Sequence, residues 1–194
     1  VSNYNAVGDS VSGTVHAGKD GVLVKGWYTG VNYKYYFGDD YFEYDNGLYT
    51  IDGKIYYFQY GHLVESTTFV NDGKVYSSDS NGVVTLIDTT GQSKWIQSGN
   101  YWYYVKDGVA LMNTLEEIDG SYYYFDSEGK MVSSQIFYYS DNAKLYANDD
   151  GVVAMNKNAW SKTDDGKVIY YMEDGTLAYG TSLTIDNKIY SFSD

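Results

Sequence analysis

Apolar and polar positions alternate over short runs in this chain, and turn-forming residues separate the runs. Residues 101–105 (YWYYV) are the clearest case: in an extended strand, Trp102 and Tyr104 point to one side and Tyr103 to the other. A polar turn precedes this run and an Asp-Gly pair follows it, which suits a tight turn because glycine adopts positive φ without steric cost. Residues 94–114 therefore predict a β-hairpin with aromatic side chains on both faces.

Units of the same kind follow one another with a period of about 20 residues, interrupted by short insertions. Aligned on the second aromatic of each run, the units place these tyrosines in register: Tyr35, Tyr56, Tyr76, Tyr103, Tyr123, Tyr146, Tyr170 and Tyr190. Turn signals recur about every ten residues. Because a single hairpin is barely stable in water, the repeats are expected to stack and to bury one aromatic face against their neighbours.

The expected fold class is therefore all-β, a solenoid of about eight β-hairpin repeats of ~20 residues each. The array is expected to span residues 14–194, with a possible division near the linker-like segment 88–93, and residues 1–13 stay unassigned. Helical patterning is almost absent, and the best place for a short helix is 113–118.

Composition and charge exclude several classes of function. The 194 residues include 25 Tyr, 7 Phe and 4 Trp but no Cys, so a disulfide framework, a thiolate nucleophile and a zinc–thiolate site are excluded. The net charge of −13 repels phosphate backbones and anionic membranes, which disfavours nucleic-acid partners. No apolar run approaches the ~20 residues of a membrane-spanning helix, so membrane insertion is not expected.

Four stretches resemble a known family: residues 26–27 (GW), 50–58 (TIDGKIYYF), 94–108 (KWIQSGNYWYYVKDG) and 118–132 (IDGSYYYFDSEGKMV). They are similar to the cell-wall-binding repeats of choline-binding proteins, of the glucan-binding regions of glucansucrases and of the C-terminal repeats of large clostridial toxins. The resemblance covers roughly residues 14–194. It implies a β-hairpin solenoid with ligands in shallow grooves between neighbouring hairpins, within a larger secreted or cell-wall-associated bacterial protein.

The resemblance also implies which aromatic side chains bind ligand. Carried over by position, these are Trp27, Tyr36, Tyr57, Trp95, Trp102, Tyr104, Tyr124, Trp160 and Tyr171. The unit at 94–108 alone has Trp at both the leading position and the aromatic run. The third unit has Ser77 and Ser78 where other units have aromatic residues, so a groove there is in doubt.

Three functions remain open at this point. The first is binding of a polysaccharide, with α-glucan favoured, because a pyranose ring has an apolar face that lies on an aromatic ring while polar groups at the rim bind its hydroxyls. The second is binding of choline, whose quaternary ammonium needs an aromatic cage, although four Trp are few for a cage in every groove. The third is a structural spacer without ligand. The oligomeric state is not predicted.

Catalysis, metal ions and cofactors are not expected. Most carboxylates fall in Asp-Gly, Asn-Asp or Glu-Gly turns, where turn geometry explains them, and Glu116 and Glu117 are adjacent and so point to opposite sides of a strand. His16 and His62 lie in different units without a Ser or Cys partner. The segment that begins at Asp79 resembles part of a calcium loop but has no acidic residue at its twelfth position.

Overall fold

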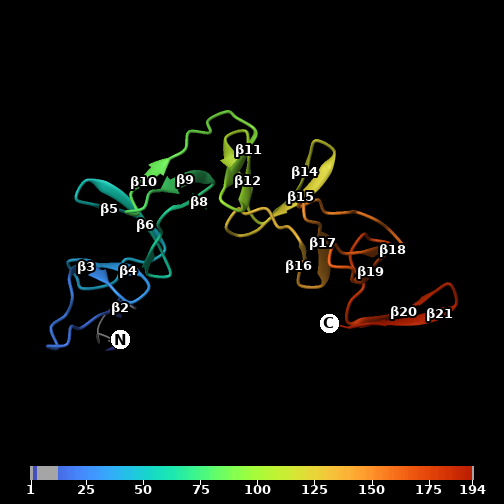
Figure 1. The fold of residues 1–194 in the computed structure, drawn as a ribbon, viewed down its shortest axis with the longest axis horizontal. Helices are drawn as coiled ribbons and strands as arrows, with labels where there is room; N and C mark the ends of the chain where they lie inside the picture. The colour runs from blue at the N-terminus through green and yellow to red at the C-terminus, as the bar shows by residue number, and fades with distance from the viewer. Residues whose placement is uncertain (1, 4–12, 194) are drawn as a thin grey trace. The chain divides into compact units, whose positions relative to one another are not determined.

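The computed structural model describes residues 2–3 and 13–193, and within them every regular element is a β-strand (Figure 1). The all-β prediction is confirmed. Most of the unassigned segment 1–13 lies outside the described residues. The place most favoured for a short helix, 113–118, is instead a strand: β14 (Thr114–Ile118) pairs antiparallel with β15 (Ser121–Phe125).

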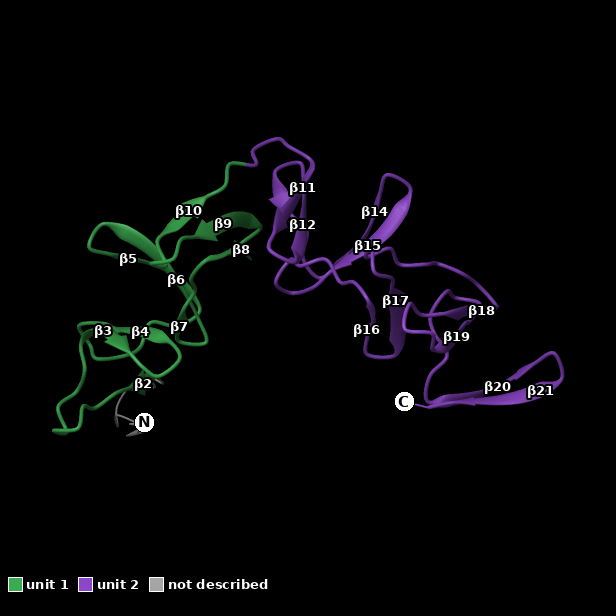
Figure 2. Ribbon diagram, in the orientation of Figure 1, with its two compact units in different colours: residues 1–88 green, residues 89–194 purple. Residues whose placement is uncertain are grey.

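The chain divides into two units, residues 1–88 and 89–194, and the boundary falls at the linker-like segment (Figure 2). In the first unit β1 (Ser2–Asn3) pairs with β2 (Thr14–Val15), and hairpins follow. Their strands are β3 (Gly26–Thr29) with β4 (Lys34–Phe37), β5 (Gly47–Ile51) with β6 (Lys54–Gln59) and β7 (His62–Leu63), and β8 (Thr67–Asn71) with β9 (Lys74–Ser78) and β10 (Val84–Leu86).

The described part of the second unit is again a row of hairpins, each antiparallel. The strands are β11 (Lys94–Ser98) with β12 (Tyr101–Lys106) and β13 (Val109–Ala110), β14 with β15, β16 (Gln135–Ser140) with β17 (Ala143–Ala147), β18 (Ala159–Lys162) with β19 (Val168–Tyr171), and β20 (Thr181–Ile185) with β21 (Lys188–Phe192). Tight turns close these hairpins, as at Asp119 and Gly120 between β14 and β15, where φ is 50° and 83°.

The alternation predicted for residues 101–105 is confirmed. Tyr103 and Val105 are fully buried, whereas Trp102 stays exposed and Tyr104 is half-buried. The position of Val105 is taken by Phe58 in β6 and by Phe125 in β15, and neither side chain is exposed to solvent. The core of each unit is therefore a row of inward-facing side chains, to which successive hairpins contribute.

Main-chain hydrogen bonds join three hairpins of the second unit, β14–β15, β16–β17 and β18–β19, each to the hairpin before it. After β15, the N–H of Met131 donates to the carbonyl of Trp102 in β12 at 2.7 Å. After β17, the N–H of Val153 donates to the carbonyl of Tyr122 in β15 at 2.8 Å. After β19, the N–H of Leu177 donates to the carbonyl of Lys144 in β17 at 2.9 Å. Packing is thus between nearest neighbours, as in other repeat proteins.

Candidate functional site: aromatic grooves between hairpins

The same arrangement of four rings recurs at three junctions between consecutive hairpins. In the first, Trp27 of β3 lies opposite Tyr36 of β4, with ring centroids 5.1 Å apart and an interplanar angle of 77°. From the next hairpin, Tyr56 approaches the same indole edge-on at 4.9 Å, and Phe58 lies 6.1 Å away. These four residues define the Trp27 groove.

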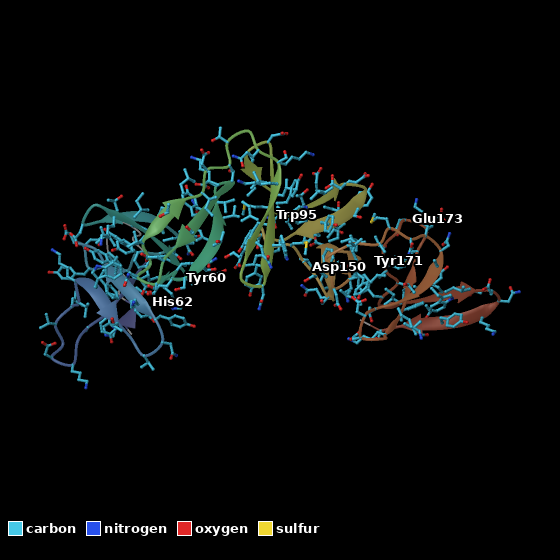
Figure 3. The ribbon with its side chains drawn as sticks, turned by 45° about the horizontal axis from the view of Figure 1, so that its top comes forward. Tyr60, His62, Trp95, Asp150, Tyr171 and Glu173 are labelled. Carbon is cyan, nitrogen blue, oxygen red and sulfur yellow. The ribbon has the colours of Figure 1, made fainter. Side chains whose placement is uncertain are left out.

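The second and third junctions repeat this geometry within about 0.2 Å. The Trp95 groove combines Trp95 with Tyr104 at 5.0 Å, Tyr123 at 5.0 Å and Phe125 at 5.9 Å (Figure 3). The Trp160 groove combines Trp160 with Tyr170 at 4.9 Å, Tyr190 at 4.9 Å and Phe192 at 6.0 Å. In every case the first Tyr belongs to the same hairpin as the Trp, and the second Tyr and the Phe belong to the hairpin that follows.

Each groove leaves part of an indole open to solvent. Trp27 and Trp160 are each 42% exposed, and Trp95 is half-buried. Phe58 and Phe125 below the first two indoles are completely buried, whereas Phe192 below Trp160 is half-buried. Two Tyr edges fix the orientation of the indole, because edge-to-face contacts are the preferred geometry of aromatic pairs. The result is a flat, rigid apolar surface with phenolic groups beside it.

Grooves occur at every third hairpin, because other residue types take the Trp position elsewhere. The residues at the same place in the strand register are Leu48, Thr68, Leu115, Ile136 and Ser182. At the two leucine junctions a Phe of the next hairpin stacks on the Tyr instead: Phe69 on Tyr57 at 4.3 Å, and Phe137 on Tyr124 at 4.7 Å. Tyr57 and Tyr124, both predicted to bind ligand, therefore each have one ring face covered.

The remaining predicted residues lie as follows. Trp102 is 38% exposed and stands perpendicular to Trp95 at 6.2 Å, so it extends the Trp95 groove along β12. Tyr171 is only 1% exposed and packs in the core with Tyr146 and Leu177 (Figure 3). Its neighbour Tyr170 takes the place opposite Trp160.

Sequence reasoning missed the tyrosines that complete each groove from the following hairpin, Tyr56, Tyr123 and Tyr190. The sequence places them in register with one another, but they are not among the residues predicted to bind ligand. The signal that could have found them is that each lies on the hairpin immediately after a hairpin with a leading Trp.

Charged pairs bridge hairpins near two of the grooves. Lys106 of β12 binds Glu116 of β14 at 2.6 Å, and Glu116 lies opposite Tyr123 in the strand register. This hydrogen bond to Glu116 raises the pKa of Lys106. Near the Trp27 groove, Lys34 of β4 binds Glu65 at 2.7 Å. Such side chains offer both hydrogen-bond donors and acceptors beside the aromatic surface.

The residues considered for metal binding and catalysis do not form a common site among the described residues. Among the described residues no group of three or more His, Asp or Glu side chains could hold a metal ion. His16 packs against Tyr28 at 4.2 Å, and His62 stacks on Tyr33 at 3.9 Å. Both histidines thus contact aromatic rings of the β3–β4 hairpin region.

Comparison with known proteins gives curated relatives but no matching family model. Glucosyltransferase-S of Streptococcus mutans is 29% identical over 168 residues, which cover 75% of this chain and 11% of the relative. Glucosyltransferase-I of Streptococcus downei is 29% identical over 177 residues, which cover 89% of this chain and 10% of the relative. Among solved structures, choline binding protein F from Streptococcus pneumoniae is 23% identical, with a TM-score of 0.37, over 88% of this chain and 56% of that chain.

The resemblance to glucan- and choline-binding repeats is confirmed. The chain spans about a tenth of the length of these curated relatives. None of the described residues forms a helix of the length and apolarity that crossing a membrane requires.

Proposed function

We propose that this chain is a non-catalytic carbohydrate-binding module that attaches a larger secreted or surface protein to polysaccharide, with α-glucan as the ligand. The observation that supports it best is the recurrence of one four-ring groove at Trp27, Trp95 and Trp160. A core alone does not require an indole there, since Leu48 and Leu115 fill the same register position.

The groove geometry suits a sugar ring. The apolar C–H face of a pyranose covers a flat aromatic surface, and the neighbouring phenolic and charged groups bind its hydroxyls. One shallow groove binds weakly, but three grooves on one chain gain affinity together on a polymer with many identical rings. The names of the two streptococcal relatives, both glucosyltransferases, favour a polymer of glucose over other glycans.

Choline is the second candidate, and one observation favours it. Each indole is flanked by two tyrosines at 4.9–5.1 Å, a set of rings that can surround a quaternary ammonium, and the net charge of −13 attracts cations. The two candidates differ in whether free choline competes with the polymer.

The test is native affinity electrophoresis of the whole chain through gels that contain dextran, starch or no polymer, with and without free choline. We expect retardation by one glucan, unchanged by choline. Single Trp27→Ala, Trp95→Ala and Trp160→Ala variants should each reduce retardation, and the triple variant should lose most of it. Val31→Ala is the matched control, because Val31 lies in the β3–β4 turn and is fully exposed. Equal mobility of the unaltered chain in all three gels would refute glucan binding.

A further inference from the structure

Two tyrosines of the first unit have a backbone conformation that their side chains do not favour. Among the described residues other than glycine, positive φ is found at Asn, Asp and Ser residues, and besides them at Tyr41 (φ 66°) and Tyr60 (φ 53°). Asn and Asp tolerate this left-handed region because their short side chains hydrogen-bond locally, whereas a bulky aromatic residue is strained in it.

Tyr41 stands where equivalent turns have glycine. The N–H of Tyr41 donates to the carbonyl of Gly38 at 3.0 Å. The N–H of Gly38 in turn donates to the carbonyl of Phe42 at 2.8 Å. The same pair of hydrogen bonds forms the turns that end in Gly129 and Gly175, whose φ values are 74° and 85°. Glycine would serve this turn without strain.

Tyr60 stands where the equivalent turn has aspartate. The β6–β7 turn is Tyr60-Gly61, and the β12–β13 turn is Asp107-Gly108. The N–H of Tyr60 donates to Asn46 Oδ1 at 3.0 Å, and that of Gly61 donates to Asp45 Oδ1 at 2.6 Å. The turn is thus held rigidly from the side chains of the preceding loop, whatever residue occupies position 60.

Packing does not explain either side chain. Tyr41 is 41% exposed, and Tyr60, which Figure 3 labels, is 73% exposed. An exposed ring gains little from burial, so neither ring offsets the strain of its backbone. Strain that folding does not require is concentrated in proteins at functional positions.

The two turns also lie against each other. A Cβ at Gly61 would lie 2.0 Å from Oε1 of Glu43, so the Glu43 side chain lies directly beside the Tyr60-Gly61 turn. Glu43 follows Tyr41 by two residues, and Asp45 holds the N–H of Gly61. Two carboxylates, those of Glu43 and Asp45, therefore lie beside the Tyr60-Gly61 turn.

We propose that Tyr41 and Tyr60 form a second carbohydrate-contact surface outside the Trp grooves, where pyranose rings of the neutral glucan stack on the two phenols and donate hydroxyl hydrogen bonds to Glu43 and Asp45. This inference rests on the proposed function. It adds contacts on the first unit that are independent of any indole.

The test compares Tyr41→Gly and Tyr60→Asn with the unaltered chain in dextran gels and by thermal unfolding. Both changes install a residue that tolerates positive φ, so Tm should be unchanged or higher while affinity for dextran falls roughly threefold to tenfold per ring. Tyr60→Phe keeps the ring and should keep the retardation. Asp107→Asn, in the equivalent turn of the second unit, should change neither quantity.

The outcomes separate this inference from the function on which it rests. An unaltered chain that dextran retards, together with Tyr41→Gly and Tyr60→Asn variants that it retards equally, would overturn the second surface and leave the Trp grooves as the binding sites. An unaltered chain that neither dextran nor starch retards would overturn both. A marked fall of Tm in either variant would contradict the premise that these tyrosines are strained.

Discussion

Replacing Trp95 by leucine should convert the Trp95 groove into a junction of the Leu115 type. Trp95 is half-buried, so about 100 Å² of its surface is covered, worth about 2.5 kcal/mol, of which leucine retains roughly half. The edge-to-face contacts with Tyr104 and Tyr123 contribute about 0.5 kcal/mol each. We therefore expect the Trp95→Leu variant to be about 2 kcal/mol less stable.

A second change should restore most of that stability without restoring the groove. At the Leu48 junction the ring of Phe69 stacks on Tyr57, and the position equivalent to Phe69 after Trp95 is Glu116. In the double variant Trp95→Leu, Glu116→Phe, the new ring should stack on Tyr104 and fill the space left by the indole. The change also removes the Lys106–Glu116 pair, in which the lysine side chain is 50% and the glutamate side chain 25% exposed.

Urea unfolding followed by circular dichroism measures the stability of the single and double variants, and dextran gels measure binding by the same proteins. We expect the double variant to lie within about 1 kcal/mol of the unaltered chain and to be retarded as weakly as the single variant. A double variant no more stable than Trp95→Leu would refute the equivalence of the junctions. A double variant retarded like the unaltered chain would refute the role of Trp95 in binding.

Two further predictions concern the scaffold. Phe125→Ala should destabilise the second unit by about 3–5 kcal/mol, because the side chain is fully buried; a shift below about 1 kcal/mol in urea unfolding would contradict its place in the core. The hydrogen bond from Lys167, with that from Thr163, lowers the pKa of Asp165 from 3.8 to about 2. Its stabilising effect is then present above pH 3.8 and lost as the pH falls towards 2, so the Asp165→Asn variant should lose less stability than the unaltered chain between pH 4 and pH 2.

The fold was largely predictable because each hairpin is encoded locally. Alternation and turn residues are enough to place Tyr103 inward and Trp102 outward. The strand Thr114–Ile118 was not predictable, because its Leu-Glu-Glu run consists of good helix formers. Its conformation is decided by pairing with the aromatic strand Ser121–Phe125. Here the partner strand overrides the intrinsic preference of the segment.

The grooves were only half predictable, because they are made by two hairpins. A leading Trp and its cross-strand Tyr come from one repeat, and the sequence points to both. The second Tyr comes from the next repeat, and its role depends on how hairpins stack, which no local pattern encodes. The seventh repeat adds a shift of one residue: Tyr171 lies opposite Ala159, as Phe125 lies opposite Thr114, so Tyr171 points inward.

The period of the grooves is longer than the period of the fold. Hairpins repeat every ~20 residues, but an indole at the leading position recurs only at every third hairpin, at Trp27, Trp95 and Trp160, with Leu48 and Leu115 following the first two. Packing differs between the two kinds of junction, since a Phe of the next hairpin stacks on the Tyr where Leu replaces the indole. Leucine and phenylalanine thus fill the core at those junctions, so folding alone does not require an indole at the others. The recurring indole accords with the proposed function, because several grooves of one kind bind a polymer of identical rings more tightly together than singly.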